Sequence, residues 1–180
     1  MSANGGGHKV RLGGLQGGEA LVSRGRTITE ADVVGFAALS GDWHPQHADA
    51  TWAAESRFGR RVAHGMLVLS YSIGLMPLDP SRVEALRGLR DVVFKRPVFI
   101  GDTIRAEGRV EAVTPLDGET ALVHLGWRIV NQHDESVARA KLAIVWRLDQ
   151  DLSSADVASR AAGEEAGGES VAGEVEEVFL

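Results

Sequence analysis

Apolar residues recur at two different spacings along the chain, and the change falls near residue 77. Before it, they follow helical spacing in three stretches, at about residues 30–39, 50–57 and 64–76. Beyond it, residues rich in Val, Ile, Thr, Phe and Trp partly alternate with polar ones, over residues 89–99, 102–113, 120–131 and 136–148. Together with a first strand at residues 19–27, this order predicts an α+β fold with one hydrophobic core.

Local sequence marks the ends of these elements. Thr29 and Asp32 match a capping box at the start of the first helix, and Asp49 is a plausible N-cap of the second. Pro77 and Pro80 stop the third helix. Residues 115–118 and 131–134 have the composition of hairpin turns, which predicts a four-stranded antiparallel meander.

A curved sheet of this kind can wrap around a hydrophobic helix. We therefore expect the helix at residues 64–76 to lie against the sheet, with four apolar side chains turned toward it: Val68, Leu69, Ile73 and Leu75.

Composition limits the domain organisation and the partners. Residues 1–18 are Gly-rich and residues 150–180 are rich in Ala, Gly and Glu, so a single domain at 19–149 between two flexible tails is expected. The net charge of -6 is concentrated in the C-terminal segment, and the nearly neutral remainder argues against nucleic acid as a partner. The longest apolar stretch, residues 65–78, is shorter than the roughly 20 residues that cross a membrane. The absence of cysteine excludes thiolate chemistry and leaves the cytoplasm as the expected compartment.

The loop at residues 40–49 holds the residues best suited to chemistry. Asp42 and His47 are five positions apart, and Pro45 between them disfavours a simple helical path. Such a loop can direct a carboxylate and an imidazole at one water molecule. Adding water across an activated double bond needs one group to take a proton from water and one to protonate carbon, and this pair supplies both.

The start of the third helix adds a place for negative charge. Its first backbone N–H groups have no helical acceptors, and Gly65 allows a ligand to approach them closely. Taken singly, these residues also have structural explanations: Asp42 as a turn residue, His47 as a surface histidine and Gly65 as an aid to helix packing. Metal binding by His44, His47 and Asp49 is a further alternative, although their spacing is not that of a strong metal motif, so no metal or cofactor is expected.

Taken together, these motifs resemble the MaoC-like, (R)-specific enoyl-CoA hydratase family. The resemblance is carried by Phe36-Ala-Ala-Leu-Ser-Gly-Asp42-Trp-His-Pro45-Gln-His47-Ala-Asp49, Phe58-Gly59, Ala63-His64-Gly65-Met66-Leu67 and Lys95-Arg-Pro97-Val-Phe-Ile-Gly101-Asp102-Thr103. It implies a hotdog fold, usually dimeric, that binds an acyl thioester of coenzyme A or of a carrier protein. It also implies that Asp42 and His47 are the catalytic pair and that the Gly65 amide binds the thioester carbonyl.

Two positions depart from the family pattern. Many members carry Asn where this chain has His44, and the hydratase subgroup often has a Ser where this chain has Ile73. Ser70 and Ser72 flank that position. We therefore count His44, His64 and Ser70 as supporting residues of the expected site.

The resemblance predicts reversible hydration of trans-2-enoyl thioesters to (R)-3-hydroxyacyl thioesters. Two alternatives remain: another thioester reaction on the same fold, such as thioester hydrolysis or amine addition to an enoyl carrier protein, and a non-catalytic acyl-binding subunit. Five cations are candidates for binding the phosphates of the thioester carrier, or else are solvated charges beside a turn and on the outer face of a strand: Arg82, Arg87, Arg90, Lys95 and Arg96.

Overall fold

The computed structural model describes residues 11–12, 15–16, 18 and 20–148. The expected N-terminal tail, residues 1–18, lies mostly outside these residues, and the expected acidic tail, residues 150–180, lies wholly outside them. Two short strands, β1 (Arg11–Leu12) and β2 (Leu15–Gln16), pair antiparallel at the N-terminal end of the described chain.

Four helices occupy the first half of the domain: α1 (Glu30–Ser40), α2 (Pro45–Ala48), α3 (Ala50–Glu55) and α4 (Gly65–Gly74). The predicted caps are confirmed, because Thr29 and Asp32 form a complete capping box and the Asp49 carboxylate accepts two amides of α3. Helix α2 was not predicted. Pro45 is its first residue, a position where a missing N–H costs nothing, so the interpretation of Pro45 as a barrier to helix was wrong.

The strands form a six-stranded antiparallel sheet from β3 (Ala20–Val22), β4 (Arg26–Thr27), β5 (Val83–Phe94), β6 (Thr103–Pro115), β7 (Thr120–Val130) and β8 (Ser136–Arg147). The single first strand expected from the sequence is thus two short strands, β3 and β4, and both pair with β6.

The sheet order is β3-β6-β7-β8-β5. The predicted hairpins between β6, β7 and β8 are confirmed, but the four-stranded meander is wrong because β5 pairs with β8. No tight turn joins β5 to β6. The chain instead passes from β5, at one edge of the sheet, across to β6 near the opposite edge. Along this connection Phe99 forms an isolated antiparallel bridge with Val62, and the Gly101 amide donates to the Ile28 carbonyl.

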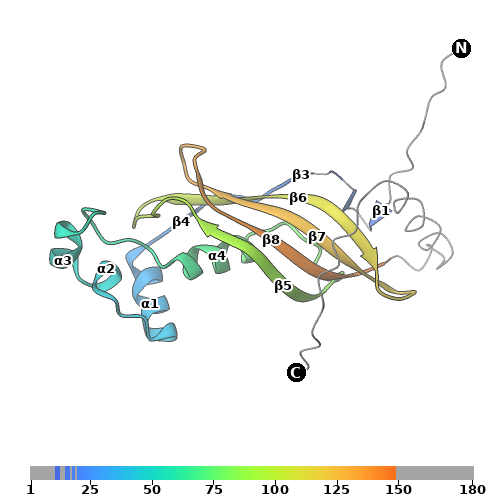
Figure 1. Ribbon diagram of the computed structural model, residues 1–180, viewed down its shortest axis with the longest axis horizontal. Coiled ribbons are helices and arrows are strands. Elements are labelled where there is room, and N and C mark those ends of the chain that lie inside the picture. Colours follow the sequence, from blue (N-terminus) through green and yellow to red (C-terminus); the bar gives the residue numbers. More distant parts are fainter. Residues whose placement is uncertain (1–10, 13–14, 17, 19, 149–180) are drawn as a thin grey trace, which may run out of the picture.

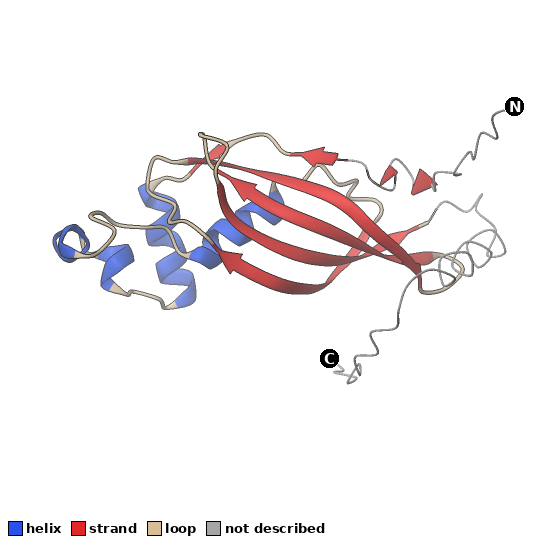
Figure 2. Cartoon of the chain, turned by 45° about the horizontal axis from the view of Figure 1, so that its top comes forward, coloured by secondary structure: helices blue, strands red, loops and turns tan. Residues whose placement is uncertain are grey.

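Helix α4 lies against the inner face of this curved sheet, and the other three helices gather at one end of the molecule (Figures 1 and 2). Val68 and Leu69 are buried as predicted, whereas Ile73 and Leu75 are only partly buried. Burying one such Leu or Val side chain contributes roughly 1.5–3 kcal/mol. Among the described residues, no helix has the length and apolar character needed to cross a membrane.

One polar contact fixes the helix on the sheet. The Trp127 indole N–H of β7 donates to the Ser72 hydroxyl of α4 at 3.0 Å, and both side chains are buried. Because an unpaired buried donor is costly, this bond favours a single position of α4 along the sheet. The first turn of α4 is thereby held at the end of the sheet where the other helices gather.

Candidate active site

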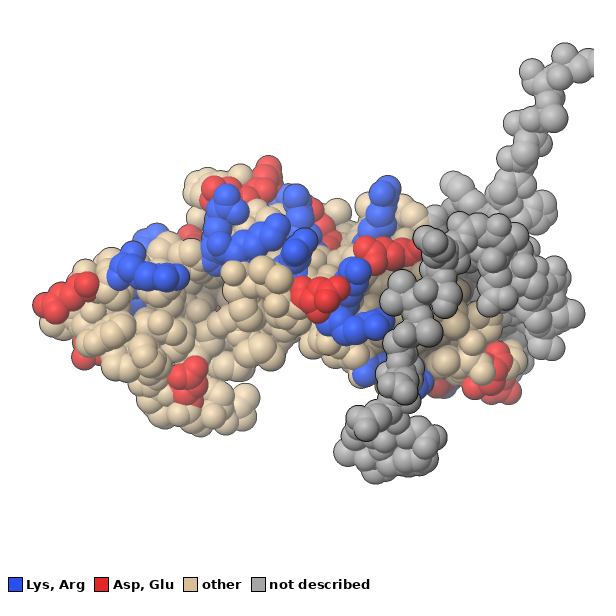
Figure 3. All heavy atoms as spheres, in the orientation of Figure 1, with Lys and Arg blue, Asp and Glu red and all other residues tan. Residues whose placement is uncertain are grey.

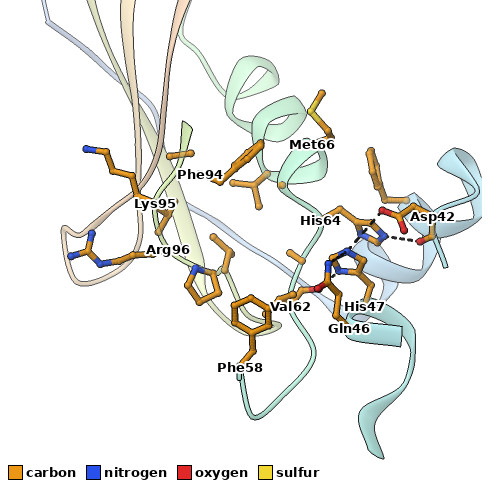
Figure 4. A pocket seen from close by; sticks show the side chains of 18 of the residues that line it. Asp42, Gln46, His47, Phe58, Val62, His64, Met66, Phe94, Lys95 and Arg96 are labelled. Atoms are coloured by element: carbon orange, nitrogen blue, oxygen red, sulfur yellow. Dashed lines mark hydrogen bonds and ion pairs between the residues drawn. The ribbon is translucent and has the colours of Figure 1, made fainter. Parts of the chain in front are cut away.

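Three helix ends meet around a cavity of about 540 Å³ (Figure 4). Asp42 follows the end of α1, where Gly41 takes the left-handed conformation with φ of 77°. His47 belongs to α2, and His64 and Gly65 form the start of α4. All four residues line the cavity, so the structure brings together the predicted pair and the predicted amide donor.

His47 is held in one orientation and one tautomer. The residue is only 5% exposed, and Nδ1 lies 2.7 Å from the Val62 carbonyl oxygen. A carbonyl can only accept, so Nδ1 carries the proton and the neutral ring presents a lone pair at Nε2. The Gln46 side-chain amide lies 3.0 Å from this Nε2 and donates to it. Nε2 is therefore the proton-accepting atom of neutral His47, and a water molecule that bonds to it must take the place of the Gln46 amide.

The Asp42 carboxylate lies beside the same nitrogen. Its Oδ2 is 3.9 Å from His47 Nε2, which is too long for a direct hydrogen bond. The carboxylate is about half exposed, whereas the imidazole is buried. A small polar molecule placed against both groups could hydrogen-bond to each of them, which is the arrangement that a shared reactive water requires.

The surroundings of His47 favour its neutral form. Burial lowers the pKa of His47, and the nearby His64 and His44 rings lower it further. The hydrogen bond to Val62 and the charge of Asp42 act in the opposite direction, but the net pKa remains below the ordinary value of 6.5. At neutral pH the ring is thus a base rather than an acid.

His64 links the parts of the site. Its ring stacks on His47 with centroids 3.8 Å apart, and its Nε2–H donates to the Asp42 backbone carbonyl at 2.9 Å. Phe36 packs against it as well, with ring centroids 5.0 Å apart. His64 is 3% exposed and its Nδ1 has no hydrogen-bond partner among the described residues. An unpaired buried acceptor is unusual, and here it accompanies a residue that touches both members of the pair.

Helix α4 begins at the cavity wall with an open end. Its N-cap, His64, makes no side-chain capping bond, so the first amides of the helix have neither a capping partner nor a helical acceptor. Space beside Gly65 is tight, because a Cβ at this position would lie 2.8 Å from the Phe94 ring. A side chain here would have to displace the exposed Phe94 ring, whereas Gly65 leaves its amide free to serve the predicted role of carbonyl donor.

Two predicted supporting residues do not line the cavity. His44 caps α2, because its Nδ1 accepts from the Gln46 amide at 3.2 Å, and its ring packs edge-on against Trp52. Ser70 is exposed on α4, and its hydroxyl donates to the Met66 carbonyl. Both contacts are structural, and of the three supporting residues only His64 reaches the cavity.

The metal alternative based on His44, His47 and Asp49 is not assembled, since His44 caps α2 and Asp49 caps α3. Asp42, His47 and His64 do offer donor atoms within 4.8 Å of one another. However, the His47 and His64 rings are stacked with an angle of only 23° between their planes. The in-plane lone pairs of the two rings therefore run nearly parallel and cannot easily converge on one ion. One nitrogen of each ring is also bound to a carbonyl.

Several cavity residues were missed or only partly foreseen. No role was predicted for Gln46, whose side-chain amide contacts His47. Nothing in the sequence indicated that Phe94 of β5 would lie over Gly65. Of the five cations considered for phosphate binding, only Lys95 and Arg96 line the cavity. Arg57 and Phe58 line it too, although the sequence suggested no role for Arg57.

A curved antiparallel sheet wrapped around a single helix is the architecture of a hotdog fold, and here an acid and an imidazole lie beside the first turn of that helix. A solved Mycobacterium tuberculosis protein described as a double hotdog fold aligns with a TM-score of 0.69 over 79% of this chain and 47% of its own, at 22% identity. The MaoC like domain model matches residues 14–129. The chain therefore belongs to the MaoC-like domain family, as the sequence motifs indicated.

Named relatives agree with this assignment. The (R)-specific enoyl-CoA hydratase of Aeromonas caviae is 42% identical over 84 residues, which are 46% of this chain and 62% of that protein. The solved monoamine oxidase regulatory protein from Archaeoglobus fulgidus is 36% identical, with a TM-score of 0.71 over 78% of this chain and 96% of its own. The first four curated relatives are matched over 28% to 65% of their lengths, so the chain spans less than two thirds of each.

Proposed function

We propose that the protein catalyses the reversible hydration of trans-2-enoyl thioesters to (R)-3-hydroxyacyl thioesters. The observation that carries the proposal is the pairing of Asp42 with the neutral His47 at 3.9 Å, beside the open end of α4 at Gly65. The similarity to a relative named (R)-specific enoyl-CoA hydratase supports the choice of reaction.

In the proposed reaction, the pair holds one water molecule. As the water oxygen bonds to the β carbon, the pair removes one of its protons and the π electrons move toward the thioester oxygen. The Gly65 amide donates to that oxygen while it carries negative charge, a contribution of about 2.7–4 kcal/mol for such donors. A proton returned to the α carbon completes the addition. Asp42 and His47 are coupled, so the proton belongs to the pair rather than to one residue.

The cavity fits the rest of the substrate. Most of its wall is apolar, which suits an acyl chain, and Lys95 and Arg96 lie on the side away from the catalytic pair (Figure 4). Two cations at this place suit the phosphates of coenzyme A or of a phosphopantetheine carrier, because cationic side chains form charge-assisted hydrogen bonds to phosphate. We further propose that the protein acts as a homodimer, since the long outer strand β5 leaves several apolar side chains exposed.

The test is the loss of enoyl absorbance when purified protein is mixed with crotonyl-CoA and longer enoyl-CoA substrates. Asp42→Asn and His47→Ala should each remove at least about 99% of kcat, and the double variant should lose little more, because residues that act as a unit are not additive. His133→Gln, an exposed histidine outside the cavity, is the matched control. A wild-type protein that leaves every enoyl-CoA unchanged would refute the proposal.

A further inference from the structure

The outer face of the sheet, turned away from α4, carries a groove of about 810 Å³. Five of its lining residues are cations and three are carboxylates: Lys95, Arg109, Arg128, Arg139 and Lys141 against Asp91, Glu107 and Glu111. Figure 3 shows Lys and Arg side chains gathered over the sheet. The groove is therefore a predominantly cationic surface on a chain whose net charge is negative.

Strand register places like charges directly opposite each other on this face. Arg128 of β7 faces Arg139 of β8, and Arg90 of β5 faces Lys141 of β8. Cross-strand pairs of like charge destabilise a sheet. The two pairs lie close together, because Arg139 and Lys141 are two residues apart on β8. Such repulsion is expected where a surface is selected to bind an anionic partner.

The chain's own carboxylates neutralise only part of this charge. Glu107 pairs with Arg128 at 2.9 Å, and Asp91 lies 3.5 Å from Lys141. Within the part of the chain that the structure describes, no carboxylate oxygen lies within 4.0 Å of Arg139. Arg139 is exposed and thus available to a partner.

A glycine forms the floor of the groove. Gly126 of β7 pairs with Arg109 of β6 on one side and with Lys141 of β8 on the other. The position between these two cations therefore has no side chain. The Glu111 carboxylate lies over Gly126, and a Cβ there would collide with it. The space above Gly126 is therefore already filled by the chain's own Glu111 carboxylate, so a partner's carboxylate would bind at the exposed Arg139 instead.

The groove and the candidate active site adjoin at Lys95, which lines both. The intermixed carboxylates argue against a uniformly charged polyanion such as nucleic acid, and suit the mixed surface of an acidic protein. We propose that this outer groove docks an acidic carrier protein, whose thioester-bearing arm enters the cavity past Lys95. This inference rests on the proposed function and assigns its substrate carrier.

The test compares crotonyl-CoA with a crotonyl group borne by a purified bacterial acyl carrier protein. Arg139→Glu should lower kcat/KM for the carrier-borne substrate by about tenfold or more through KM, and should change crotonyl-CoA turnover by less than about twofold. Arg24→Glu makes the same charge change at an exposed residue outside the groove and should affect neither substrate. Lys141→Glu should repeat the effect of Arg139→Glu.

An equal loss with both substrates, or an unchanged KM for the carrier-borne substrate, would overturn the docking proposal. If the wild-type protein hydrates neither substrate, the proposed function fails, and calorimetric titration with the unloaded carrier protein decides the docking separately. Binding that Arg139→Glu weakens and Arg24→Glu does not would uphold the docking surface. No binding by the wild-type protein would overturn it.

Discussion

The burial of His47 has a direct consequence for the pH dependence of the reaction. Burial, together with the His64 and His44 rings, holds the pKa of His47 below 6.5 in the folded protein. The base form therefore persists to lower pH than for an ordinary histidine. We predict that the acid limb of the kcat/KM profile lies below pH 6.5, measured with crotonyl-CoA between pH 4.5 and 8. An acid limb above pH 6.5 would contradict this account of His47.

His64 offers a prediction in which activity and stability separate. In His64→Phe a ring remains between Phe36 and His47, but the donor to the Asp42 carbonyl is lost. Losing one such hydrogen bond is worth about 1 kcal/mol, or roughly fivefold, so kcat should fall while KM changes little. Removal of the unpaired Nδ1 offsets the lost hydrogen bond, so the unfolding temperature should change little.

The comparison for His64 is His64→Gln, which retains an amide donor but removes the stacked ring. We expect it to recover part of the kcat lost in His64→Phe if the bond to Asp42 positions the pair. Steady-state kinetics and thermal unfolding of both variants provide the measurement. Wild-type kcat in both variants would show that His64 has no positioning role.

Helix α1 is fastened to the rest of the molecule through Asp32, which receives hydrogen bonds from three residues. The Tyr71 hydroxyl of α4 donates at 2.6 Å, the Thr29 amide at 2.8 Å and Arg26 at 3.0 Å. Burial by itself would raise the pKa of Asp32, but these bonds outweigh it and lower the pKa far below its ordinary value. The contact ties β4, α1 and α4 together.

A lowered pKa in the folded state stabilises the protein above the unfolded pKa of about 3.9, and the contribution is lost as pH falls toward the folded value. Asp32→Asn should accordingly lower the free energy of unfolding by about 1–3 kcal/mol at pH 7, and the difference should shrink at about pH 3. Urea denaturation of both proteins at the two pH values measures this. A difference that is independent of pH would contradict the assignment to the Asp32 charge.

Local sequence foretold the elements better than their pairing. The capping box at Thr29, the Asp49 cap and the two hairpin turns depend on neighbouring residues, and all three predictions are confirmed. The partner of β5 could not be foreseen, because its strand pattern fits either neighbour. The pairing depends on where the long connection after Phe94 carries the chain.

The same distinction holds for the candidate site. Asp42, His47 and Gly65 were found from a motif, and the structure places them around one cavity. Contacts between distant residues were not accessible from the sequence, such as Phe94 over Gly65. His44 stood next to the pair in sequence, yet its ring nitrogen is used in a helix cap. Proximity along the chain therefore suggested a site role for His44 that its cap contact does not support, and it gave no indication of Phe94.

Within the described residues, β5 forms the long edge of the sheet. Strand β5 has 12 residues, pairs only with β8 and leaves four large apolar side chains exposed: Leu86, Val92, Val93 and Phe94. A long apolar edge is usually covered, since its free backbone groups and side chains promote pairing with another chain. Pairing of two β5 strands about a two-fold axis would close both edges at once and form the proposed homodimer.

We predict that native mass spectrometry of the purified protein gives twice the chain mass of 19.2 kDa. Leu86→Lys should shift the protein toward monomer, because a charged residue on an edge strand opposes pairing. Val22→Lys changes an exposed apolar residue on β3, at the other edge of the sheet, and should leave the dimer intact. A wild-type monomer at micromolar concentration, or equal effects of the two substitutions, would exclude β5 as the dimer contact.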